Sequence, residues 1–179
     1  LETARGGMLR RGLAVEHADA AIITNIAEDH FGEFGIGDLR SLTEAKLIVT
    51  RALGSSGQLV LNADDPQLVA AGSLVELPIS WFASDSRNAT LRAHIAAGGR
   101  AATVDAGSFL LVRDRQAEPV AAIADVPIPP SGAAPPHTPN VLGVIARAPA
   151  PRLHAAPPER GPATVPGPTA RSARGRRGG

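Results

Sequence analysis

The stretch Ala20-Ala21-Ile22-Ile23-Thr24 begins the part of the sequence that decides the fold. It is a short apolar run of the kind that forms buried strands, and a Gly-rich polar loop follows it. Asp38 then offers an N-cap for a helix whose apolar residues include Leu39, Leu42, Leu47 and Val49. A second apolar run, Gln58-Leu59-Val60-Leu61, comes next. Strand, loop, helix and strand in this order predict a parallel βαβ unit.

Beyond Leu77 the pattern changes to short apolar runs separated by turn residues. Gly98-Gly99 and Asp105-Ala106-Gly107 lie where hairpin turns would be expected. We therefore expect an α/β fold: a partial parallel sheet with helices, followed by a small antiparallel β section. The runs expected as strands in that section are Ile79–Phe82, Thr90–Ile95, Ala101–Val104 and Phe109–Val112.

The last third of the chain differs in composition from the rest. Residues 1–125 carry 16 Asp and Glu against 11 Lys and Arg, a net charge of −5, whereas residues 126–179 carry 7 Arg and one Glu, a net charge of +6. Thirteen of the 16 prolines lie between Pro127 and Pro168, so backbone donors for helices or sheets are few there. We expect a domain over residues 1–148, ending in two helical turns over Val141–Ala148, and a disordered tail over residues 149–179.

Three interpretations of the tail remain open. The simplest is a solvated segment, since no aromatic residues interleave with the arginines to stack on bases, which makes nucleic acid an unfavoured partner. The second is nucleic-acid binding through the Arg/Gly end. The third is out-of-frame translation of a GC-rich gene, because Pro, Arg, Ala and Gly are the residues that such a reading yields.

Composition also excludes several classes of protein. The chain of 179 residues has no cysteine, which rules out disulfides and thiolate chemistry. No apolar run approaches the roughly 20 residues that span a bilayer, and no secretory signal opens the chain. We expect a cytoplasmic protein without membrane contact. Because it opens with Leu1-Glu2 rather than Met, we also expect the sequence to begin partway through a gene.

Polar residues collect at the predicted strand ends, where open α/β sheets bind ligands. Asn25 follows the first strand and is itself followed by Glu28, Asp29 and His30, while Asn62, Asp64 and Asp65 follow the second. A Glu and a His from adjacent loops could hold a divalent cation, and oxygen ligands suit Mg²⁺. Ordinary polar turns would give the same pattern, so spacing alone leaves both interpretations open.

Lys46 is the only lysine in the chain, against 17 arginines. Where arginine fills the generic cationic positions, a remaining lysine suggests chemistry that a guanidinium cannot perform, because an amine can lose its proton and act as a nucleophile. It could attack a carbonyl, or react with CO₂ to give a carbamate that ligates metal. The alternative is a lysine retained by chance on a solvated helix face.

Four motifs in order within 66 residues resemble the Mur ligase superfamily, most closely its cyanophycin-synthetase branch. They are Leu1-Glu2-Thr3-Ala4-Arg5-Gly6-Gly7-Met8-Leu9-Arg10-Arg11-Gly12-Leu13, Thr24-Asn25-Ile26-Ala27-Glu28-Asp29-His30, Glu44-Ala45-Lys46 and Leu61-Asn62-Ala63-Asp64-Asp65-Pro66. The resemblance covers residues 1 to about 148 and implies the central, ATPase domain of an ATP-dependent acid–amino-acid ligase. Such ligases phosphorylate a carboxylate with ATP, and an amine then attacks the acyl phosphate.

The same resemblance implies roles for individual residues. Glu2 would bind the Mg²⁺ that bridges the β- and γ-phosphates, and His30 a second Mg²⁺ near the substrate carboxylate. A carbamylated Lys46 would support that second ion, so His30 and Lys46 are the expected catalytic residues. Asn140, in a variant of the family's His-Asn-x-x-Asn motif, would contact adenine. Substrates would be an amino acid and a peptide or polymer carboxylate, and the intact protein is expected to form a homo-oligomer.

The family's phosphate-binding loop is missing, since the sequence contains no G-x-x-x-x-G-K. We therefore expect a fragment that is inactive by itself, whose phosphate-binding loop precedes Leu1. Two alternatives remain: a fragment of a muropeptide ligase, and a non-catalytic nucleotide- or protein-binding remnant that keeps the fold but not the chemistry.

Overall fold

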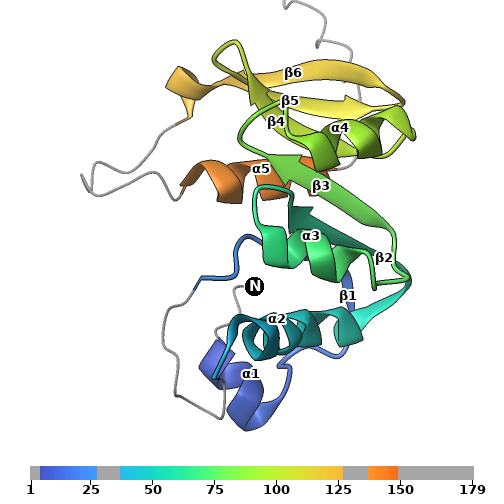
Figure 1. Cartoon of the computed structure of the whole chain (residues 1–179), viewed down its shortest axis with the longest axis vertical. Coiled ribbons are helices and arrows are strands. Elements are labelled where there is room, and N and C mark those ends of the chain that lie inside the picture. The colour runs from blue at the N-terminus through green and yellow to red at the C-terminus, as the bar shows by residue number, and fades with distance from the viewer. Residues whose placement is uncertain (1–4, 28–36, 127–136, 149–179) are drawn as a thin grey trace, which may run out of the picture. The chain divides into compact units, whose positions relative to one another are not determined.

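The computed structural model describes residues 5–27, 37–126 and 137–148 (Figure 1). All of them belong to one compact unit, Leu1–Pro149. The tail predicted over residues 149–179 lies outside the described residues, and the domain boundary stays a prediction. The elements are α1 (Arg5–Arg11), β1 (Ala18–Ile23), α2 (Leu39–Leu47) with a 3-10 turn (Ile48–Ala52), β2 (Leu53–Asn62), α3 (Pro66–Gly72), β3 (Ile79–Ala83), α4 (Ala89–Ala96), β4 (Ala101–Asp105), β5 (Ser108–Arg113), β6 (Gln116–Ala122) with a 3-10 turn (Ile123–Asp125), and α5 (His137–Arg147).

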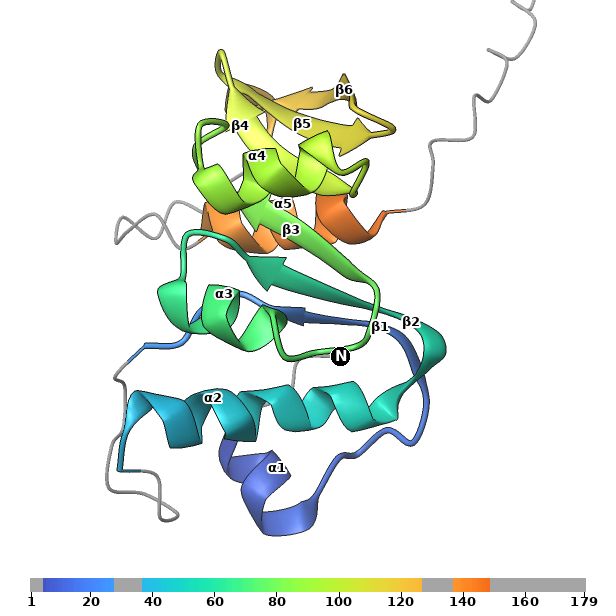
Figure 2. The ribbon, with the colours of Figure 1, turned by 45° about the vertical axis from the view of Figure 1, so that its right-hand side comes forward.

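One six-stranded sheet organises this unit, and its strands follow in chain order from β1 to β6. β1 to β4 pair with one another in parallel, whereas the β4–β5 and β5–β6 pairs are antiparallel (Figure 2). α2, α3 and α4 connect the successive parallel strands. The expected α/β fold and its first βαβ unit, β1-α2-β2, are confirmed.

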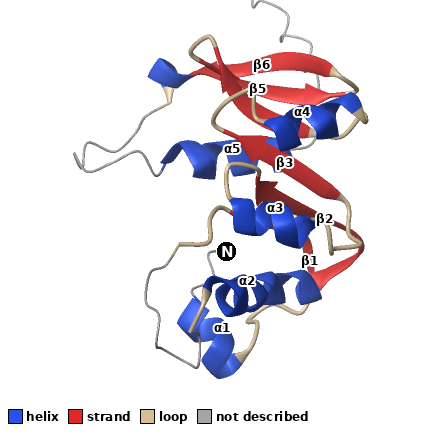
Figure 3. Cartoon of the chain, viewed as in Figure 1, coloured by secondary structure: helices blue, strands red, loops and turns tan. Residues whose placement is uncertain are grey.

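Side chains alternate between the two faces of the sheet, as the pleat requires. Leu59, Leu61 and Trp81 share a buried cluster with residues of α2, α3 and α4, whereas Val60 and Phe82 share one with α5. The sheet is therefore a middle layer, with three helices on one face and α5 on the other (Figure 3). This double coverage explains why the parallel strands read as continuous apolar runs.

The prediction of a strand over Thr90–Ile95 is wrong, because this segment lies inside helix α4. The side-chain oxygen of Asn88 accepts a hydrogen bond from the N–H of Leu91 at 3.1 Å and starts the helix. Three alanines in Ala89–Ala96 favour helix, and Leu91 is its fully buried residue. Gly98, with φ of +87°, ends that helix rather than forming a hairpin.

The antiparallel section differs from the prediction at both of its ends: it excludes β3 and it includes the additional strand β6. β3 and β4 pair in parallel, so antiparallel pairing begins only at the β4–β5 hairpin. The turn expected at Asp105-Ala106-Gly107 is confirmed, and positive φ at Ala106 and Gly107 suits a two-residue hairpin loop. β6 was not predicted.

Helix α5 extends the helix predicted over Val141–Ala148 toward the N-terminus, since it begins at His137. Leu142, Ile145 and Ala146 are its buried residues, and their spacing is that of one helix face. They pack on Val60 of β2 and Phe82 of β3. The segment is thus part of the folded unit despite its proline-rich surroundings.

Candidate functional site at the carboxyl edge of the parallel strands

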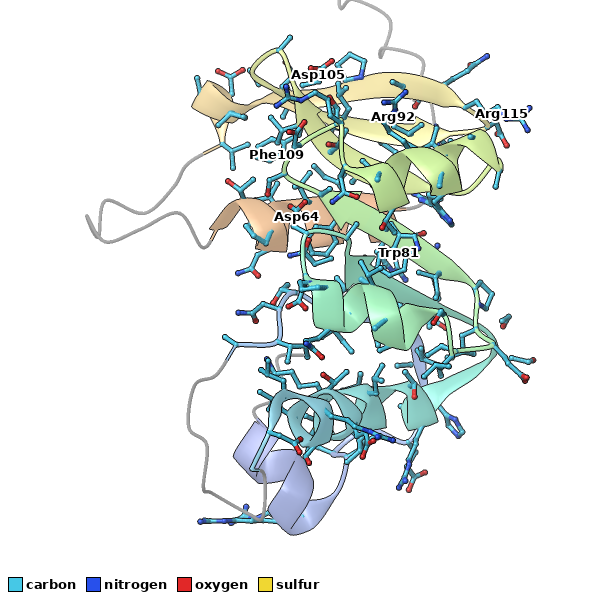
Figure 4. The ribbon with its side chains drawn as sticks, viewed as in Figure 1. Asp64, Trp81, Arg92, Asp105, Phe109 and Arg115 are labelled. Carbon is cyan, nitrogen blue, oxygen red and sulfur yellow. The ribbon has the colours of Figure 1, made fainter. Side chains whose placement is uncertain are left out.

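Four of the polar residues singled out in the sequence, Asn25, Asn62, Asp64 and Asp65, lie at the carboxyl ends of β1 and β2; Glu28, Asp29 and His30 lie outside the described residues. Asn25 follows β1, and the turn Asn62–Asp65 leads from the last residue of β2 into α3. Figure 4 shows Asp64 at this edge, where the β2–α3 and β3–α4 connections come close. Parallel topology brings these groups together because neighbouring strands end on the same side of the sheet.

Asn62 joins the ends of two strands. Its side-chain amide donates a hydrogen bond to the carbonyl oxygen of Thr24, at 2.9 Å, and its side-chain oxygen accepts one from the N–H of Asp64, also at 2.9 Å. Asn62 is buried, and both hydrogen bonds are partly buried. The residue therefore fixes the β1 loop against the β2–α3 turn.

The two aspartates of the turn are likewise committed to the backbone around them. Asp64 accepts hydrogen bonds from the N–H of Ser84 at 2.7 Å and from the side chain of Asn88 at 3.0 Å. Asp65 caps α3, with Pro66 at the first helical position, and accepts from the N–H of Gln67 and Leu68. Its other carboxylate oxygen accepts from the N–H of Ile26.

The turn Asn62–Asp65 thus holds three strand ends in register, a role that the sequence interpretation left unassigned. The Asp65-Pro66 pair was the available signal, because Asp at the N-cap and Pro at the first helical position are a preferred helix start. The contacts to Thr24, Ile26 and Ser84 had no local signal, since they join residues 20 or more positions apart.

Lys46 is the predicted catalytic residue that the structure describes. It lies in the last turn of α2, is partly buried, and its ammonium nitrogen donates a hydrogen bond to the carbonyl oxygen of Asn25 at 2.7 Å. Asp38 begins α2 as predicted, its carboxylate accepting from the N–H of Ser41 at 2.7 Å. That backbone hydrogen bond is the main cause that lowers the pKa of Asp38. The helix therefore carries the only lysine to the carboxyl end of β1.

Glu2 and His30, the other predicted metal ligands, lie outside the described residues. Asn140, predicted to contact adenine, lies in the first turn of α5 with its side chain exposed. Within residues 5–27, 37–126 and 137–148, no three His, Cys, Asp or Glu side chains gather where they could hold a metal ion. Over the same residues, no helix is both long and apolar enough to cross a membrane.

Asp85, in the β3–α4 connection, forms an ion pair with Arg87. The guanidinium of Arg87 donates from Nη2 to its carboxylate at 2.9 Å and from Nε at 3.0 Å. These hydrogen bonds lower the pKa of Asp85 and raise that of Arg87. Both side chains are exposed, so the pair orders the loop rather than forming a buried site.

Residues 1–110 match the Mur ligase middle domain, and the chain belongs to that family. The expected family is therefore confirmed. The cyanophycin synthetase of Nostoc sp. (strain PCC 7120) is 34% identical over 135 residues, which is 75% of this chain and 15% of that protein. The cyanophycin synthetase of Synechocystis sp. (strain PCC 6803) is 36% identical over 107 residues, or 60% of this chain and 12% of that protein.

A muropeptide-type relative matches a shorter part of the chain. The UDP-N-acetylmuramoylalanine–D-glutamate ligase of Chlorobium luteolum is 48% identical over 62 residues, which is 35% of this chain and 13% of that protein. In each of these three comparisons the chain spans 12% to 15% of the relative's length. The family is that of ligases.

Proposed function

We propose that this chain supplies the nucleotide-handling domain of a ligase that uses ATP and Mg²⁺ to join an amino acid to a peptide or polymer carboxylate through an acyl phosphate. The observation that carries the proposal is the position of Lys46 beside Asn25 at the carboxyl end of β1. Relatives named cyanophycin synthetase, which cover more of the chain than the muropeptide ligase does, favour the cyanophycin-type branch.

Lys46 is proposed to react with CO₂. The ammonium group first loses one proton to solvent. The neutral amine then attacks the carbon of CO₂, a nitrogen–carbon bond forms as one carbon–oxygen π bond opens, and a second proton leaves to solvent. The side chain thus changes from a cation to an anion. The carbamate nitrogen keeps one hydrogen, which can still be donated to the carbonyl of Asn25. The new carboxylate oxygens are the donor type that Mg²⁺ prefers.

Glu2 and His30 are proposed to complete the magnesium ligands, and Asn140 to contact adenine. Bound Mg²⁺ would offset the repulsion between the γ-phosphate of ATP and the substrate carboxylate, and stabilise the charge of the transferring phosphoryl group. The carbamate supports this chemistry because it replaces a positive charge, which would repel the metal, by a negative one. The turn Asn62–Asp65 holds the backbone of Thr24 and Ile26 on either side of Asn25, the residue that Lys46 contacts.

The 179-residue chain by itself is proposed to be inactive. It contains no G-x-x-x-x-G-K sequence, so it lacks the backbone cradle and the lysine that would hold the phosphates. We expect no amide formation when the chain is incubated with ATP, Mg²⁺ and amino acids. Amide formation by the chain alone would contradict this part of the proposal. A cytoplasmic location and a homo-oligomeric assembly are part of the same proposal.

Carbon-13 NMR with labelled bicarbonate tests the lysine chemistry directly. We expect a carbamate signal that disappears in Lys46→Arg, which keeps the positive charge but offers no nucleophilic amine. The comparison separates Lys46 from the α-amino group, the other amine of the chain. A spectrum that is the same for both proteins would contradict the carbamate.

Ligation is tested in a longer polypeptide in which a phosphate-binding loop precedes this segment. Lys46→Ala should lower turnover by about 100-fold or more, because metal-assisted charge stabilisation is worth several kcal/mol. Arg40→Ala is the matched control, since Arg40 lies on the exposed side of the same helix. Equal turnover by Lys46→Ala and Arg40→Ala would contradict the metal-supporting role of Lys46, whereas no turnover by the unchanged longer polypeptide would favour the non-catalytic alternative.

A further inference from the structure

Three arginines from three elements come together at the amino edge of β4, opposite to the edge that holds Lys46. Arg100 precedes β4, Arg113 ends β5 and Arg147 ends α5. Ala101 pairs with Val112, so Arg100 and Arg113 are cross-strand neighbours one position further out. Ala146, beside Arg147, is buried in one cluster with Ala102 of β4 and Leu111 of β5, which brings the end of α5 to these strands. Burial first, and then the charges of Arg113 and Arg147, lower the pKa of Arg100.

Strand alternation places these side chains on one face of the sheet. Ala101 and Val112 belong to the cluster on the side of α2, α3 and α4. Their neighbours Arg100 and Arg113 therefore turn to the other face, which α5 covers. Arg147 lies in the last turn of that same helix.

Several of the guanidinium donors have no acceptor. Nε and Nη2 of Arg100 and Nε of Arg113 are buried without a hydrogen-bond partner among the described residues. Nε and Nη2 form the side of a guanidinium that binds two oxygens of one carboxylate or phosphate. In Arg113, Nη2 donates to Glu118 at 2.7 Å.

The cluster carries three positive charges, and within the part of the chain that the structure describes Glu118 pairs with one of them, on Arg113. Arginine stays protonated in proteins, so burial cannot remove the charge by deprotonation. Buried charged donors without an acceptor are costly. The negative end of the α5 dipole accounts for Arg147, but not for the unused side of Arg100.

We propose that Arg100, Arg113 and Arg147 form a binding site for an oxyanion, a carboxylate or a phosphate, beside the last turn of α5. Arg100 and Arg113 are partly exposed and Arg147 is exposed, so the cluster reaches the surface. Rotation of the Arg100 guanidinium would present its two-donor side to an anion there. The site is independent of the proposed ligase chemistry, which lies at the other edge of the sheet.

Calorimetry and thermal unfolding of the 179-residue chain test this site, with inorganic phosphate and succinate as separate probes and sodium chloride keeping ionic strength constant. We expect saturable binding that raises the unfolding temperature and is at least tenfold weaker in Arg100→Gln. Arg92→Gln is the control, because it removes the same charge from the exposed surface of α4 (Figure 4) and should bind as the unchanged chain does.

The two probes identify the ligand: saturation by phosphate alone, by succinate alone or by both supports a phosphate, a carboxylate or a general oxyanion site. No saturable binding by either probe, or equal binding by Arg100→Gln, would overturn the proposal. If Arg100→Gln does not fold, nitrogen-15 NMR of the unchanged chain replaces it. The Nε resonances of Arg100 and Arg113 should then shift with phosphate or succinate, and unshifted resonances would overturn the proposal.

Discussion

Asp65 accepts a hydrogen bond from the backbone N–H of Ile26, 39 residues earlier in the chain. The same carboxylate caps α3 through the N–H groups of Gln67 and Leu68. One buried side chain therefore joins the loop after β1 to the helix after β2, and both connections end at the candidate site.

Replacing Asp65 by alanine should lower the free energy of unfolding by about 2–4 kcal/mol. The loss combines a helix cap, worth roughly 1 kcal/mol, with a buried N–H of Ile26 left without an acceptor, which costs roughly 1–3 kcal/mol. Urea denaturation measures it. Asp38→Ala, which removes an exposed cap alone, should cost less, and an equal loss in both variants would show that the contact to Ile26 contributes nothing.

Gly72→Ala should destabilise the chain by roughly 1–3 kcal/mol, because a β-carbon there would lie 2.7 Å from the ring of Trp81. Trp81 is the only tryptophan, so its fluorescence should change as the ring moves. Gly54→Ala is the control, since a β-carbon at that position of β2 meets nothing within 4 Å. An unchanged spectrum and stability in Gly72→Ala would mean that the ring does not pack there.

Leu142→Ala should cost about 2–5 kcal/mol, the usual range for deleting a fully buried leucine side chain. Val144→Ala, in the same helix but 61% exposed, should change stability little. Thermal unfolding of the two variants tests whether α5 covers the sheet face built by Val60 and Phe82. Similar unfolding temperatures would mean that α5 is not part of the core.

His94 should make the chain less stable as the pH falls below about 6.5. Burial lowers its pKa, and the hydrogen bond with the carbonyl of Arg100 offsets part of that effect. The unfolded chain then binds a proton at a higher pH than the folded chain does, so stability is complete above the ordinary value and is lost as pH falls toward the folded pKa. His94→Gln should flatten this part of the pH profile in urea denaturation, and a parallel profile would contradict it.

Short apolar runs and helix caps, which are local features of the sequence, predicted most of the sheet. Apolar runs gave β1, β2 and β3 their approximate positions, and Asp38 gave the start of α2. The apolar residues of Thr90–Ile95 favour a strand, whereas the cap at Asn88 and the alanines that follow favour helix α4, which the structure contains. β6 was not predicted, because its residues are exposed or partly buried and form no apolar run.

The sequence predicted which residues lie at the candidate site, but not the hydrogen bonds that join its loops. The sequence places Asn25, Asn62 and Lys46 near strand ends, and the structure brings Lys46 to Asn25. No local pattern indicates that Asp64 and Asp65 hold backbone groups of distant loops, because those partners come close only after the sheet forms. Glu2 and His30 lie outside the described residues, so their roles stay predictions.

The order of the strands has a consequence for synthesis on the ribosome. Each strand pairs with the one made just before it, so the sheet can grow step by step as the chain emerges, without waiting for distant partners. α5 is made after all six strands, and it is the helix that covers Val60, Phe82 and Ala102. Until α5 leaves the exit tunnel, the apolar face of the nascent sheet that this helix covers is exposed to chaperones and to aggregation.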